Sequence, residues 1–205
     1  MCTPSPAWWT PIVTFLAGAV IALFAEPLRK WIFRTAIKVS FEPKTCDLKT
    51  NTTIEIPGAL GPTYKSEGRW VRVRVETTRN RLAKGCRAYL VKVEVEENGK
   101  FCPSNFIDPL RLKWSSLPGD EVTKPLDIPK DVSQFVDVLS TDQHSPNRYV
   151  AQTMLMPNYC SHLFDERPKT LRLTITVTSD DAKPTKTRII FRWKGTWDMF
   201  EVSSG

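Results

Sequence analysis

The sequence predicts a mainly β protein, a two-sheet antiparallel sandwich preceded by one transmembrane helix. Three observations support this. A charge-free apolar segment lies near the start of the chain, residues 69–77 and 170–178 alternate strictly between apolar and polar side chains, and 16 prolines with 9 glycines separate several other short apolar runs. We therefore expect two parts, a membrane anchor with a juxtamembrane helix at residues 1–34 and a β-sandwich domain at residues 35–205.

The apolar segment begins at Ala7 and ends at Ala25, nineteen residues without a charge. As a helix it would span about 28 Å at ~1.5 Å per residue, close to the roughly 30 Å of a hydrocarbon core. Trp8 and Trp9 at its start and Trp31 beyond its end occupy positions where indoles rest among lipid headgroups. A cleaved signal peptide is the alternative, but residues 1–6 lack the basic residues it requires. An uncleaved single-pass anchor is expected.

The basic residues around this segment predict its orientation. Arg29, Lys30, Arg34 and Lys38 follow it and no Lys or Arg precedes it. Because basic flanks stay on the cytoplasmic side, we expect the N-terminus outside the plasma (inner) membrane and the domain in the cytoplasm. The reverse topology would make the domain an extracytoplasmic ligand-binding module.

Alternation places Val71, Val73 and Val75 on one face of the strand at residues 69–77. In residues 85–97 the apolar positions change from the parity of Leu90 to that of Tyr89 and Val93, which predicts a β-bulge or a shift of sheet near Tyr89. Residues 44–68 are rich in proline and glycine and predict a long loop with a short strand at residues 52–56. Further strands are expected at residues 36–41, 110–114, 133–139, 149–156, 188–193 and 196–202, the last two joined at Gly195, which gives eight or nine strands apart from the short one at residues 52–56.

The strand–turn–strand core and the tryptophan motifs resemble those of uncharacterised bacterial membrane-anchored immunoglobulin-like domains of the CARDB type. The residues that carry the resemblance are Val71-x-Val73-x-Val75, Asn80, Ala83, Gly85-Cys86, Leu112-x-Trp114 and Trp193-Lys194-Gly195-x-Trp197-Asp198. It extends over about residues 70–205 and implies an Ig-like sandwich. It brings no active site.

Composition sets broad limits on function. The net charge of +7, from 29 basic and 22 acidic residues, is moderate, and no arginine-rich stripe or aromatic run indicates nucleic-acid binding. Five cysteines without CxxC spacing indicate free thiols in a reducing cytosol. Phosphate-binding glycine loops and the common hydrolase motifs are absent, so we expect no cofactor.

Cys160 and His162 form the best catalytic candidate, because a thiol and an imidazole two residues apart could activate a nucleophile or bind a metal. Zinc normally requires four ligands, and the only other histidine is His144. A surface loop that happens to contain both residues is therefore the favoured interpretation, and no metal site is predicted.

A local basic cluster is the binding candidate. It consists of Arg72, Arg74, Arg79, Arg81 and Lys84, and it could receive a phosphate or an acidic partner unless acidic residues across the sheet neutralise it. Trp197 is left open as a ligand-stacking residue, whereas Trp114 and Trp193 are expected in the core.

These features favour a membrane-tethered cytoplasmic binding or scaffolding module without catalysis. Its expected partners are membrane lipid, through the N-terminal helix, and a protein, with no nucleic acid. The alternative is a thiol-dependent or hydrolytic enzyme that uses Cys160 and His162. The arrangement of these two side chains decides between the two hypotheses.

Overall fold

The computed structural model describes residues 35–54, 64–78, 81–153, 157–164 and 167–205. Residues 35–205 form a compact unit separate from residues 1–34. The predicted membrane anchor, from Ala7 to Ala25, lies outside the described residues. Within the described ranges no helix is long and apolar enough to cross a membrane.

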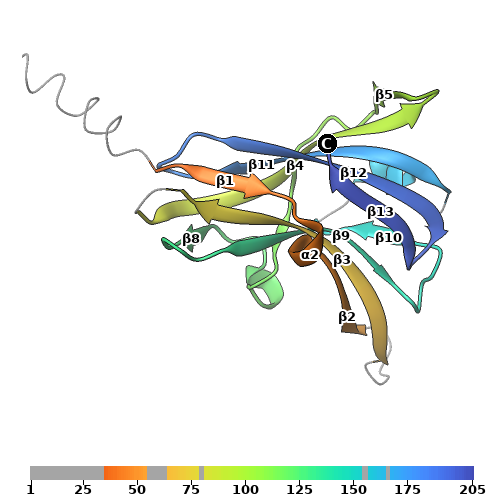
Figure 1. Ribbon diagram of the computed structural model, residues 1–205, viewed down its shortest axis with the longest axis horizontal. Coiled ribbons are helices and arrows are strands. Elements are labelled where there is room, and N and C mark those ends of the chain that lie inside the picture. Colours follow the sequence, from red (N-terminus) through yellow and green to blue (C-terminus); the bar gives the residue numbers. More distant parts are fainter. Residues whose placement is uncertain (1–34, 55–63, 79–80, 154–156, 165–166) are drawn as a thin grey trace, which may run out of the picture. The chain divides into compact units, whose positions relative to one another are not determined.

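Two antiparallel sheets form a sandwich, as predicted (Figure 1). The six-stranded sheet contains β1 (Ile37–Ser40), β3 (Tyr64–Thr77), β9 (Gln134–Asp142) and β10 (Tyr149–Ala151) in that order, with β2 (Asp47–Ile54) on β3 and β7 (Lys113–Trp114) on β9. The seven-stranded sheet contains β13 (Met199–Ser204), β12 (Thr185–Thr196), β11 (Lys169–Thr178), β4 (Ala83–Glu97) and β5 (Lys100–Pro103), with β6 (Leu110–Arg111) and β8 (Leu126–Ile128) on β4. Short helices complete the described fold: α2 (Pro43–Cys46), η1 (Gly119–Glu121) and η2 (Asn158–Phe164).

The two strands with strict alternation are confirmed and supply much of the core. Successive side chains of a strand point to opposite faces, so every second residue can be buried. Val71, Val73 and Val75 of β3 are buried from one sheet. Four residues of β11 are buried from the other, namely Leu171, Leu173, Ile175 and Val177.

The predicted bulge lies in β4 at Val91. β11 pairs Ile175 with Leu90 but Thr174 with Lys92, which leaves Val91 as the extra residue. The core-facing parity therefore shifts from Leu90 to Val93, and both are buried. The expectation that Tyr89 shares the face of Val93 is wrong, because Tyr89 precedes the bulge and is only half-buried.

The long loop predicted at residues 44–68 is wrong. This part of the chain contains α2, β2 and the first residues of β3, and β2 pairs with β3 from Asp47 opposite Val71 to Ile54 opposite Tyr64. Figure 1 shows the two strands extending together as a hairpin. The residues of β2 are mostly polar, so the strand forms through its backbone ladder and lacks the apolar alternation that would reveal it. Of the predicted strand at residues 52–56, positions 55 and 56 lie outside the described residues.

Two other expectations need correction, and both concern where a strand changes course. The predicted strand at residues 110–114 is two strands in different sheets: Leu112 donates its amide to Ala88 O (2.9 Å), and Lys113 donates to Gln152 O (3.2 Å). Gly195 lies inside β12 at a bulge, with φ +100°, and the turn to β13 follows it. Thirteen strands are described where eight or nine were expected, because residues 110–114 form two strands and because β5 and β8 were not predicted.

Arg69 joins the two sheets at one end of the sandwich. Its Nε and Nη2 donate to both carboxylate oxygens of Asp47 (2.7 and 2.5 Å), and its Nη1 donates to the carbonyls of Asp198 and Phe200 (3.1 Å each). The guanidinium also lies 3.8 Å from the centroid of the Phe200 ring. One side chain of β3 thus holds the β12–β13 hairpin against the opposite sheet.

The core predicts the outcome of a matched pair of substitutions in residues 35–205. Val73→Asp places an unpaired carboxylate at a site with 0 % exposure and should lower the free energy of unfolding by about 3–5 kcal/mol. Val150→Asp, the same change at a position 41 % exposed on β10, should cost less than about 1 kcal/mol. Urea titration followed by circular dichroism measures both. Equal losses would contradict the assigned core.

Candidate functional site

The predicted basic cluster is dispersed, and its two central members are occupied by internal contacts. Arg74 forms ion pairs with Glu76 and with Glu42 (3.5 Å) and donates to the Ser133 hydroxyl (3.0 Å). Arg72 lies with its guanidinium 4.5 Å from the centroid of the Phe135 ring. These arginines stabilise the outer face of the six-stranded sheet, which leaves them poorly suited to bind a partner.

The other predicted binding residues lie elsewhere. Lys84 is exposed near the start of β4, in the other sheet, and its backbone N–H donates to Asp181 Oδ1 (3.1 Å). Arg81 is exposed just before β4, and Arg79 lies outside the described residues. Trp197 occupies the β12–β13 turn, where its carbonyl accepts a hydrogen bond from the Thr141 hydroxyl (2.8 Å).

Trp197 is half-buried, and Lys49 Nζ lies 6.0 Å from the centroid of its ring. This position shows no other feature of a stacking site. Trp114 and Trp193 are buried in the core, as predicted.

Cys160 and His162 point to different surroundings within η2. Cys160 is fully buried, its Sγ donates to the carbonyl of Pro157 (3.3 Å), and burial raises the pKa of its thiol. His162 is exposed and lines a pocket. A nucleophilic cysteine needs a lowered pKa and a base within reach, so this arrangement does not support thiol catalysis.

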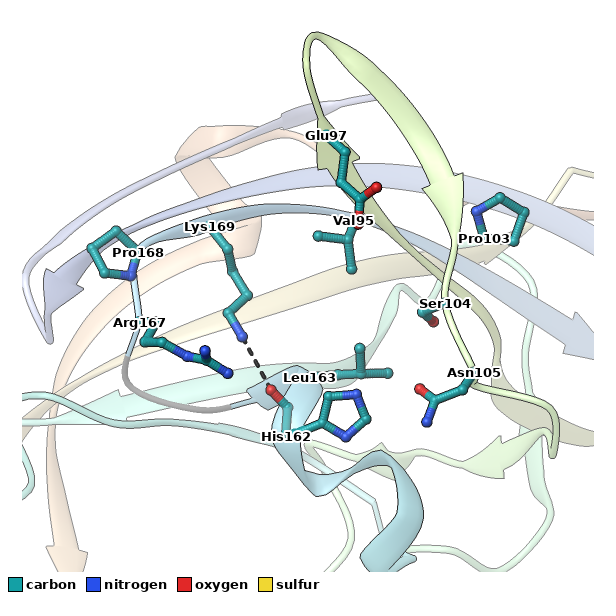
Figure 2. Close-up of a pocket in the computed structure, with 10 residues that line it drawn as sticks. All are labelled: Val95, Glu97, Pro103, Ser104, Asn105, His162, Leu163, Arg167, Pro168 and Lys169. Carbon is teal, nitrogen blue, oxygen red and sulfur yellow. Dashed lines mark hydrogen bonds between the residues drawn. The ribbon is translucent and has the colours of Figure 1, made fainter.

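The pocket beside His162 has a volume of about 400 Å³ and lies where η2, the start of β11 and the β4–β5 hairpin meet (Figure 2). The His162 ring and the Asn105 amide face the same hollow, with Val95 and Leu163 beside them. Lys169 Nζ donates to the His162 carbonyl (3.1 Å). The pocket offers dispersed polar groups around an apolar floor, and no catalytic pair is assembled in it.

The described residues contain no group of three or more His, Cys, Asp or Glu side chains placed to hold a metal ion. The four described cysteines have free thiols, as predicted: Cys46, Cys86, Cys102 and Cys160. Cys86 is fully buried, and burial together with the charge of Asp181 raises its pKa to about 12. Such a thiol is unreactive at neutral pH.

A different surface concentrates positive charge, the outer face of the seven-stranded sheet. Ile189, Phe191 and Trp193 of β12 are buried in the core. Alternation therefore directs the intervening side chains outward, and four of them are exposed cations: Lys186, Arg188, Arg192 and Lys194. At ~3.4 Å per residue, the row they form along one strand is about 27 Å long.

Two further cations lie on neighbouring strands and are stabilised by one carboxylate. Arg172 of β11 donates to both oxygens of Glu94 (2.7 and 2.8 Å) and lies 4.4 Å from the centroid of the Phe101 ring. Lys92 Nζ donates to the same carboxylate (2.9 Å). Glu94 is 4 % exposed, and its hydrogen bonds with Arg172 and then Lys92 lower its pKa to about 2.

We call these six cations the basic face: Lys92, Arg172, Lys186, Arg188, Arg192 and Lys194. The outer side of these strands and of β13 also carries three carboxylates, namely Glu94, Glu96 and Glu201. The six positive charges of the basic face therefore lie near three negative charges. Glu201 pairs with Lys194 (2.5 Å). In the part of the chain that the structure describes, three cations of this face form no ion pair, namely Lys186, Arg188 and Arg192.

Sequence reasoning missed the row on β12, although a signal for it was present. Residues 186–194 carry Lys or Arg at four of five alternate positions, with Ile190 at the fifth. The intervening apolar residues show that these cations share one face of a strand. The sequence pattern does not show which carboxylates lie beside this row in the folded chain. Those carboxylates determine whether the charge of the row is neutralised.

No protein-family model matches the sequence, and no curated protein matches it significantly. The resemblance to CARDB-type domains therefore stays a prediction.

Glu94 provides a test of the electrostatics of the basic face. Its pKa is lower in the folded protein than in the unfolded chain, so its stabilising contribution is complete above about pH 4.5 and is lost as the pH falls toward about 2. Glu94→Gln should therefore cost about 2 kcal/mol of unfolding free energy at pH 7, and the difference from wild type should shrink below pH ~4.5. Urea titrations at a series of pH values measure it. A pH-independent difference would attribute the loss to packing alone.

Proposed function

We propose that this chain is a membrane-tethered cytoplasmic binding module without catalytic activity, and that it binds an anionic partner through the basic face. The observation that carries the proposal is the excess of cations held on one rigid sheet, with Lys186, Arg188 and Arg192 outside any ion pair among the described residues.

The placement of these cations favours binding over a merely solvated surface. Their backbone lies in β12, which is paired on both sides by β11 and β13, so the spacing of the charges is fixed before a partner arrives. Charges of one sign on a common face also produce a field that attracts an opposite charge and accelerates encounter. The outer face of the six-stranded sheet offers less, because Arg74 there is already paired with Glu76 and Glu42.

The expected membrane anchor, and the lack of an assembled catalytic pair among the residues that the structure describes, also support the proposal. Anchoring through the segment from Ala7 to Ala25 would raise the local concentration of the domain at the membrane, which strengthens otherwise weak surface binding. The separation of buried Cys160 from exposed His162 argues against the thiol enzyme.

Retention by heparin, a generic polyanion, tests the proposal on the full chain in detergent. Replacing Lys186, Arg188, Arg192 and Lys194 with Gln should weaken binding at low salt by at least about tenfold. The slope of log Kd against the logarithm of the salt concentration should also decrease by about 3, because fewer counterions are released on binding. A fluorescent heparin fragment provides the titration.

The matched control removes the same number of charges from exposed lysines outside the seven-stranded sheet: Lys44, Lys49, Lys124 and Lys130. This variant and the double variant Cys160→Ser with His162→Ala should bind as wild type does. Equal weakening in the two four-charge variants would show that net charge alone matters and would refute the basic face as a binding site.

A further inference from the structure

We infer that the partner of the basic face is the anionic lipid surface of the same membrane in which the chain is anchored. This inference rests on the proposed function and names its ligand as lipid headgroup phosphates and carboxylates. Three observations support it: where the described domain begins, how few residues connect it to the apolar segment, and which groups the basic face offers.

The domain begins beside the first cation of the basic face. Thr35 forms a parallel bridge with Ala182 and donates its hydroxyl to Asp181 Oδ2 (3.0 Å). Two residues later, the carbonyl of Ile37 accepts a hydrogen bond from the Thr185 hydroxyl (3.0 Å). Lys186 comes next in the sequence, so the start of the domain and the start of the cation row lie at the same end of β12.

The connection to the apolar segment is short. Ten peptide steps separate Ala25 from Thr35, and a fully extended chain of that length spans at most about 35 Å. Whatever conformation the connection adopts, the Lys186 end of the face stays within reach of the headgroups if Ala25 ends a membrane span. Arg29, Lys30 and Arg34 lie in this connection and would add to the attraction to an anionic leaflet.

The chemistry of the face fits headgroups better than it fits other polyanions. Single-stranded nucleic acid is bound through exposed aromatic rings, but Phe191 and Trp193 point into the core and Phe101 lies under Arg172. A protein interface is usually centred on exposed apolar residues, and at the middle of the row only half-buried Ile190 is apolar. A lipid surface requires only dispersed cations, and the face offers these in a row about 27 Å long.

Distance to the lipid surface tests the inference on the full chain reconstituted in nanodiscs. One set of discs contains phosphatidylcholine alone, and the other contains about one-third phosphatidylserine. A donor dye is placed through Ser203→Cys, which lies opposite Ile190 on the outer side of β13, and acceptor dyes are placed on the headgroups. The control position is Val150→Cys, exposed on the six-stranded sheet. Both carry Cys2→Ser and Cys102→Ser, because Cys102 is half-exposed.

Energy transfer from position 203 should be high in the phosphatidylserine discs and low in phosphatidylcholine discs or at high salt, while position 150 should show little change. Replacing Lys186, Arg188, Arg192 and Lys194 with Gln should lower the ratio of docked to undocked domain about 100-fold. The four-charge control at Lys44, Lys49, Lys124 and Lys130 should dock normally.

Equal energy transfer in the two kinds of disc, or failure of the chain to insert into either, would overturn the inference. If lipid docking fails but heparin binding still depends on the four cations, the proposed function survives and only the lipid assignment is wrong. If neither lipid docking nor heparin binding depends on these cations, the proposed function and the lipid assignment are both wrong. A duplex or single-stranded oligonucleotide, or an acidic peptide, that displaces the domain from phosphatidylserine discs at concentrations well below those of the lipid would reassign the face to that partner.

Discussion

Burial of Ile189, Phe191 and Trp193 determines the outward direction of the alternate side chains of β12 from Lys186 to Lys194. The rings of Phe191 and Trp193 each lie 5.0 Å from the ring of Tyr149, on the opposite sheet, by centroid distance. A slip of one residue would bring Arg188 or Arg192 into this apolar layer, where an unpaired charge is very costly. The packing that forms the core therefore also holds the cations on the outside, so the proposed binding surface is as rigid as the sandwich itself.

The two outer faces show why a count of cations does not identify a binding surface. On the six-stranded sheet, Arg74 meets carboxylates from its own strand and from the segment before α2, and Arg72 covers an aromatic ring. On the seven-stranded sheet, the Glu94 carboxylate accepts hydrogen bonds from both Lys92 and Arg172. Arg188 has no ion pair among the described residues. The two faces differ in how many carboxylates lie near their cations, and this number depends on how the chain folds.

Sequence reasoning recovered the parts of the fold that depend on local periodicity and missed those that depend on distant partners. The alternation around Val73 and Leu173 identified buried strands, and the parity change predicted an irregularity near Tyr89, which is the bulge at Val91. β2 was missed because its polar residues owe their strand conformation to pairing with β3. The basic cluster around Arg74 was selected for its density in the sequence, but Glu42 and Ser133 reach it only in the folded chain. The row on β12 was visible as alternation, yet its lack of compensating carboxylates was not.

Lysine footprinting on the native full chain measures whether the basic face contacts an anionic lipid surface, and it alters no residue of the face. The chain in phosphatidylserine nanodiscs is briefly acetylated and each lysine is quantified by mass spectrometry, with phosphatidylcholine discs as reference. We expect Lys186 and Lys194 to be acetylated several-fold more slowly in the anionic discs, whereas exposed Lys44 and Lys49 should react at the same rate in both. Unchanged acetylation of Lys186 and Lys194, or equal protection of all four lysines, would contradict this expectation.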